Sequence, residues 1–197
     1  MNTKLVQDLV LQSLEHERGG VKIYATAILC ALDSRLKGEW EKYHAETTTH
    51  VQKLEGVCRA MGLDPETETP GRAVVRYTGN ALVQTMKLAL ADAEPAAAEI
   101  VACECVVLAE TKDHLDWELL TKCAERLEGP GAEALSKACA EIEDQEDEHL
   151  YHTKGWCREL WIQALGLPPV LPPPEERRHV RTAIGAANAE QAAERLR

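Results

Sequence analysis

Residues 135–160 read LSKACAEIEDQEDEHLYHTKGWCREL, and every third or fourth position of this stretch falls on one stripe of a helix. Most of the stripe is apolar, but Glu146 and His149 lie in its middle. In full it consists of Leu135, Cys139, Ile142, Glu146, His149, Thr153, Trp156 and Leu160. Because charged side chains are rarely buried unless they are paired or bind a metal, the stretch predicts a helix that faces a buried polar site.

Three other stretches show the same pattern of an apolar helix stripe interrupted by ionisable residues. The interruptions are Glu17 in residues 10–28, His50 in residues 36–61, and Glu110 with His114 in residues 100–117. Four helices that each carry a carboxylate or an imidazole in the apolar stripe predict one polar site shared by all of them.

Composition favours an all-α fold. The 197 residues are 45% hydrophobic, contain no Phe, and are rich in the helix formers Ala, Leu and Glu. No stretch alternates apolar and polar residues in the way that a half-buried strand does. The length predicts one domain with an appendage.

Breaks in the helical pattern divide the chain. Gly62, Gly129-Pro130-Gly131 and Gly166 are residues that end helices or separate them. The predicted helices cover residues 3–32, 36–61, 72–90, 95–127 and 132–165. Two antiparallel hairpins joined by a long helical connection then form a four-helix bundle at 1–166. A Pro-rich extension with a short C-terminal helix is expected at 167–197.

The polar residues of each hairpin are predicted to lie at the same level. Glu17 and His50 are each roughly 25 Å along a helix from the turn near Asp33, and Glu110 and His149 are each about 30 Å from the turn at Pro130. A weak internal repeat supports a two-fold relation between the hairpins. Residues 50–58 and 149–157 share His, Gly and Cys at matching positions.

The ligand candidates follow from helix geometry. Positions i and i+3 or i+4 share a helix face, which makes Glu146 and His149 one pair. In the second helix Glu46 with His50 is preferred to Glu41 with His44, since His50 lies on the stripe. Glu17 and Glu110 act as lone carboxylates. Further candidates are His114, His152 and Glu104. Glu15 is expected to face solvent, with competition with Glu17 as the alternative, and His16 is expected to lie at the surface or to face its hairpin.

The chemistry of these side chains points to a metal. Mixed carboxylate and imidazole ligands suit Fe, with Mn or Zn as alternatives. The seven cysteines include no C-x-x-C pair and are expected to be buried, reduced thiols of a cytoplasmic protein. A net charge of -11 argues against binding to nucleic acid or to an anionic membrane, and no apolar run has the ~18 residues of a membrane span.

Residues 3–165 resemble the ferritin-like di-iron carboxylate superfamily, which includes rubrerythrins, bacterioferritins and bacterial stress-associated ferritin-like proteins. The pattern of that superfamily is Glu, Glu-x-x-His, Glu and Glu-x-x-His on four successive helices. It falls here on Glu17, His50, Glu110, Glu146 and His149, and residues 44–55 also resemble the second helix of the stress-associated group. The resemblance implies a ferritin-like bundle that binds two irons per chain and reacts with O₂ or peroxide.

The second helix departs from the pattern, because Thr47 stands where Glu-x-x-His requires a glutamate. Either Glu46 takes its place through a local irregularity such as a π-bulge, or the site is asymmetric. No rubredoxin-like cysteine pairs occur, so a complete rubrerythrin electron-transfer chain is not expected.

The main functional hypothesis is therefore a dinuclear metal protein for oxidation of Fe(II) by O₂ or peroxide, or for defence against oxidative stress. One alternative is a di-metal oxygenase for a small organic substrate, with Ala45, Thr47 and Thr48 leaving room for it. The other is a non-catalytic helical bundle that binds a partner. The acidic surface and the Pro-rich extension favour a homo-oligomer, with a dimer as the expected state.

Overall fold

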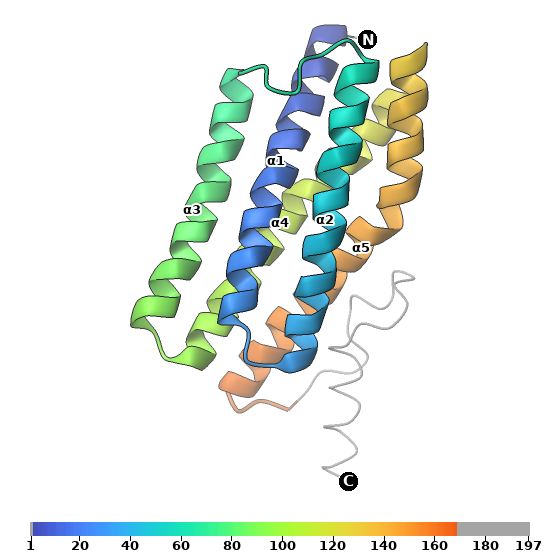
Figure 1. Ribbon diagram of the computed structural model, residues 1–197. Helices are drawn as coiled ribbons and strands as arrows, with labels where there is room; N and C mark the ends of the chain where they lie inside the picture. The colour runs from blue at the N-terminus through green and yellow to red at the C-terminus, as the bar shows by residue number, and fades with distance from the viewer. Residues whose placement is uncertain (1, 169–197) are drawn as a thin grey trace.

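The computed structural model describes residues 2–168, which form five α-helices and no strand (Figure 1). The all-α prediction is confirmed, and the helices begin and end within a few residues of the predicted positions. From residue 169 on, the predicted Pro-rich extension lies outside the described residues. The helices are α1 (Thr3–Cys30), α2 (Ser34–Ala60), α3 (Pro70–Asp92), α4 (Pro95–Ala124) and α5 (Pro130–Ala164).

Local sequence explains where the helices begin and end. The side chains of Asn2, Asp33 and Thr69 accept hydrogen bonds from first-turn amides of α1, α2 and α3. Gly62 and Gly129 have φ angles of +71° and +82° in the connections after α2 and before α5. Such angles disfavour side chains with a Cβ, so glycine is suited to both turns.

The packing of the helices follows a simple scheme (Figure 1). Contacts join α1 to α2, α2 to α5, α5 to α4 and α4 to α1, which makes a closed cycle of four helices. The helix of the long connection, α3, packs against α1 and α4. None of the helices in residues 2–168 is both long and apolar enough to span a membrane.

Two apolar clusters fill the core, one on each side of a polar layer. One contains Trp40, Val106 and Trp156, and the other contains Leu14 and Leu135 among its members. Along each helix of the cycle, the ionisable residues of the stripe separate the members of one cluster from those of the other. The predicted common level of these residues is therefore confirmed.

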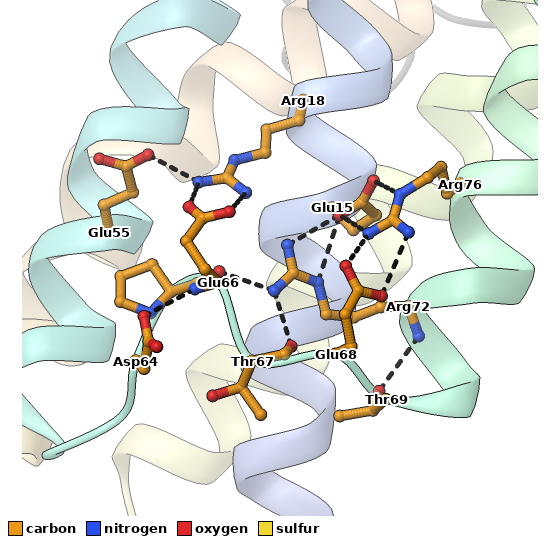
Figure 2. Close-up of polar contacts among 11 residues, drawn as sticks. Glu15, Arg18, Glu55, Asp64, Glu66, Thr67, Glu68, Thr69, Arg72 and Arg76 are labelled. Carbon is orange, nitrogen blue, oxygen red and sulfur yellow. Dashed lines mark hydrogen bonds and ion pairs between the residues drawn. The ribbon is translucent and has the colours of Figure 1, made fainter.

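A second group of buried charges lies where the α2–α3 connection meets α1 and α3 (Figure 2). The fully buried guanidinium of Arg72 donates to Glu15 Oε2 at 2.8 Å and to the carbonyl oxygens of Pro65 at 2.6 Å and Thr67 at 2.8 Å. Arg76 donates to Glu15 Oε1 at 2.7 Å. Burial acts to raise the pKa of Glu15, but the hydrogen bonds from the two arginines outweigh it and lower that pKa.

The expectation that Glu15 faces solvent is wrong, because only 5% of this residue is exposed. Its carboxylate is neutralised by arginines that lie 57 and 61 residues further along the chain. We call Glu15, Arg72 and Arg76 the arginine cluster.

Candidate metal centre

The first half of the candidate centre joins α1, α2 and α5. His50 Nδ1 lies 3.0 Å from Glu146 Oε1 and 3.5 Å from Glu17 Oε1. All three residues are at most 1% exposed. We call Glu17, His50 and Glu146 the first trio.

The second half joins α4 and α5. His149 Nδ1 lies 3.7 Å from Glu110 Oε2 and 3.7 Å from Glu146 Oε1. Glu110, Glu146 and His149 form the second trio, and they are equally buried, with at most 3% exposed. In each trio the three ligand atoms lie within 4.8 Å of one another, which is close enough to hold one metal ion. Glu146 belongs to both trios, so the two groups share one carboxylate.

The outer nitrogens of the two histidines are held in a crossed arrangement. His50 Nε2 lies 2.8 Å from Gln145 Oε1, and His149 Nε2 lies 3.0 Å from Glu46 Oε2. Gln145, the partner of His50, precedes His149 by four residues, and Glu46, the partner of His149, precedes His50 by four residues. This is the two-fold relation that the internal repeat predicts. Because these oxygens accept hydrogen bonds, each Nε2 carries a proton and each Nδ1 faces the glutamates, as metal-binding histidines require.

Glu46, predicted as a ligand, therefore lies on the outer side of the His149 ring and outside both trios. It reaches this position without the suggested π-bulge, since α2 is a regular α-helix over its whole described length. The structure favours the asymmetric reading of the departure at Thr47. Thr47 is buried at the position that corresponds to Glu146 in the repeat, and it packs close to Gly20.

The centre contains many buried polar atoms that lack a hydrogen-bond partner within residues 2–168. One bond that is made runs from Trp117 Nε1 to Glu17 Oε1 at 2.8 Å. The atoms without a hydrogen bond include Glu17 Oε2, Glu110 Oε2, both Glu146 oxygens, His50 Nδ1 and His149 Nδ1. Leaving a buried polar group without a hydrogen bond costs about 1–3 kcal/mol, and more if it is charged. These atoms converge on the two trios, where metal ions would satisfy them.

The electrostatics of the centre show an excess of negative charge. Burial raises the pKa of Glu110 well above its ordinary value, and the charge of Glu146 adds to the effect. Burial also raises the pKa of Glu17. Burial acts to lower the pKa of His50, but the carboxylates of Glu146 and Glu17 outweigh it and raise that pKa to about 11. Burial also acts to raise the pKa of Glu146, but its interactions with His50 and His149 outweigh burial and lower that pKa. In the absence of a cation, Glu17 and Glu110 are therefore the carboxyl groups of the two trios that retain protons more readily than usual.

Asp113 is a buried carboxyl group that the stripe did not predict. It lies on α4 one turn after Glu110 and is 4% exposed. Burial raises its pKa well above the ordinary value, and the charges of Glu17 and Glu146 contribute. The spacing Glu110-x-x-Asp113 is the sequence signal that could have indicated it.

His16 is also buried, which excludes the surface position, one of the two positions expected for it. Its Nε2 lies 3.0 Å from the carbonyl oxygen of Ala109 on α4. Burial lowers the pKa of His16, so its imidazole is neutral near pH 7.

The three additional ligand candidates lie outside both trios. His152 Nδ1 lies 3.0 Å from the Tyr43 hydroxyl and 3.6 Å from Glu39. His114 lies 3.3 Å from Asp147. Glu104 accepts a hydrogen bond from the Trp161 indole in an exposed position.

Comparison of the chain with family models, curated proteins and solved structures gives no match. The class of the site is therefore inferred from its own chemistry. Three carboxylates and two imidazoles suit first-row divalent cations. The buried cysteines do not belong to either trio, and burial raises the pKa of thiols such as Cys103, which keeps them protonated.

Proposed function

We propose that this protein is a ferritin-like di-iron carboxylate protein that oxidises Fe(II) with O₂ or peroxide as the oxidant. It would serve iron handling or defence against oxidative stress. The observation that carries the proposal is the sharing of Glu146 by two buried trios in which Glu17 Oε2, Glu110 Oε2, Glu146 Oε2 and His149 Nδ1 lack a hydrogen bond within the described residues. Mn and Zn fit the same ligands, and iron is the choice that gives redox chemistry.

The topology supports the same proposal. The helices α1 and α2 form one hairpin and α4 and α5 form the other, with α3 in the long connection between them. This is the four-helix arrangement with one long crossover that di-iron carboxylate proteins use. Each of the four helices contributes at least one residue to the two trios.

Each residue of the centre has a distinct role in this proposal. Glu146 bridges the two positions, while Glu17 and Glu110 each complete one of them and contribute negative charge. His50 and His149 bind through Nδ1, and Gln145 and Glu46 fix the orientation of their rings through Nε2. When bound, a pair of ferrous ions supplies the two electrons that reduction of peroxide requires.

The shape of the site favours small oxidants over an organic substrate. The cavity that reaches Glu146 has a volume of about 220 Å³, and most of the side chains that line it are charged. Thr47, which was expected to leave room for a substrate, is buried against Gly20. Since substrate pockets are mostly apolar, the oxygenase alternative receives less support.

Elemental analysis after anaerobic loading with Fe(II) tests the proposal. We expect about two irons per wild-type chain, and a loss of both from Glu146→Gln because the bridge is removed. Asp144→Asn, on the exposed side of the same helix, is the matched control and should retain both ions. Addition of O₂ or peroxide to the loaded wild type should produce a ferric absorbance change. A wild-type chain that binds no iron would refute the proposal and favour the non-catalytic alternative.

A further inference from the structure

A cavity of about 220 Å³ lies between α4 and α5 and ends at the candidate metal centre. Its floor is formed by Glu146 and Trp117, and its outer part includes His114, Glu118, Glu143 and Asp147. We call this cavity the acidic entrance.

The floor connects the acidic entrance directly to both trios. Glu146 is 1% exposed, its Oε1 lies 3.0 Å from His50 Nδ1, and its Oε2 has no hydrogen-bond partner among the described residues. Trp117 donates its indole hydrogen to Glu17 of the first trio. A cation that moved down this cavity would therefore meet the shared carboxylate first.

The outer part of the cavity carries the charge that attracts cations. Glu118, Glu143 and Asp147 contribute three carboxylates, and the described residues that line the cavity include no lysine or arginine. His114 lies between two of them, at 3.3 Å from Asp147 and 3.6 Å from Glu118. Concave sites with charge of one sign raise the local concentration of counter-ions and can speed association by 10–10³-fold.

A second cavity, next to the arginine cluster, lacks this excess of acidic side chains. It has a volume of about 510 Å³, and its charged lining residues carry both signs: Arg18, Lys22, Arg76, Glu15 and Glu66. None of the residues that line it belongs to either trio. Arg18 pairs with Glu66 and Arg76 pairs with Glu15, so this cavity has no excess of acidic side chains to attract cations.

We propose that the acidic entrance is the route by which divalent cations reach the buried centre, with Glu118, Glu143 and Asp147 as carboxylates that attract them in transit. The inference rests on the proposed function, because it assumes that cations bind at the two trios. It adds the direction of entry and assigns a role to side chains that are not ligands of the bound ions.

Stopped-flow binding of Co²⁺ at low ionic strength tests the route, with the visible absorbance of the bound ion as the signal. The test variant is the double substitution Glu118→Gln with Glu143→Gln, in which both side chains are exposed. We expect association about 3–10-fold slower than in the wild type, with the same amount of Co²⁺ bound at saturation. Added salt should slow the wild type more than the variant.

The control removes the same charge elsewhere, through Glu41→Gln with Glu128→Gln, two exposed residues away from the cavity. Charge reversal by Glu118→Lys with Glu143→Lys should slow association further than neutralisation does. Equal rates in the wild type and the neutralised variant, or an equal decrease in the control, would overturn the entry route alone. A wild type that binds no Co²⁺ would overturn the proposed function and the entry route together.

Discussion

The arginine cluster and the candidate metal centre are both groups of buried charges, but they are neutralised in different ways. In the arginine cluster, Glu15 receives hydrogen bonds from Arg72 and Arg76, and its pKa is lowered. In the centre, carboxylates outnumber the imidazoles, and the pKa of Glu110 is raised. In the arginine cluster two arginines face one carboxylate, whereas in the centre two histidines face three carboxylates.

This difference separates a structural role from a functional one. Buried charge costs several kcal/mol per ion unless the protein compensates it. The arginine cluster compensates its carboxylate within the chain, and so it joins the α2–α3 connection to α1 and α3 (Figure 2). In the centre, His50 compensates only part of the carboxylate charge, and the raised pKa of Glu110 is the expected property of a site that lacks its cation.

Among single substitutions, breaking the arginine cluster should have the largest effect on stability. Arg72→Met removes the guanidinium and leaves Glu15 buried with a weaker partner, which should lower the free energy of unfolding by about 3–5 kcal/mol. Urea denaturation monitored by circular dichroism measures this change. The control is Arg59→Met, the same substitution at an arginine that is 63% exposed. A loss in Arg72→Met no greater than in this control would contradict the structural role of the cluster.

The metal-free centre should make stability fall as pH rises above about 5. Glu17, Glu110 and Asp113 have raised pKa values, so the folded state retains protons that the unfolded state has released. Each retained proton lowers the free energy of unfolding by about 1.4 kcal/mol per pH unit. His16, whose pKa is lowered, opposes this trend below about pH 6.5, but it is a single group against three carboxyls.

Urea denaturation of chelator-treated protein between pH 5 and pH 7 measures this slope. Glu110→Gln should reduce this slope by about 1.4 kcal/mol per pH unit, the contribution of one proton, because an amide does not ionise. The paired carboxylate of Glu15 behaves in the opposite way, because its pKa is lowered. Its ionised form stabilises the fold at neutral pH, and this stabilisation is lost only when the carboxylate is protonated in acid. Stability that rises steadily from pH 5 to pH 7 would show that the centre is compensated as the arginine cluster is.

Removing the partner of one histidine should weaken metal binding by a smaller amount. Glu46→Gln replaces the carboxylate that orients His149 with an amide, as Gln145 already provides for His50. We expect affinity for Zn²⁺ to fall about 10-fold, measured by competition with a chelating dye. Glu41→Gln on the exposed side of α2 should leave the affinity unchanged. An equal affinity in both variants would mean that Glu46 does not support the metal.

An exposed ion pair next to the arginine cluster should contribute least to stability. Arg18 pairs with Glu66 at 2.6 Å, but the Glu66 side chain is 70% exposed. Glu66→Gln should therefore change the free energy of unfolding by less than about 1 kcal/mol. A loss as large as that in Arg72→Met would show that burial does not decide the strength of these pairs.

The sequence allowed the five residues of the two trios to be predicted, because each lies on a stripe whose spacing follows from helix geometry alone. Asp113 and Gln145 lie off that stripe, and their positions depend on the neighbouring helices. The ion pair of Glu15 with Arg72 joins residues that are 57 positions apart. No local pattern indicates such a contact, since it depends on how the long connection returns to α1.

The distribution of the two trios over four helices has a consequence for the kinetics of folding. Glu17 and His149 are 132 residues apart in the chain, so the two trios are complete only when all four helices have packed. A cation bound there stabilises the native state and not a partly assembled intermediate. Interactions that are absent from the transition state slow unfolding without speeding folding. A loaded molecule should therefore persist longer before it unfolds, and its lifetime should depend on the cation supply around it.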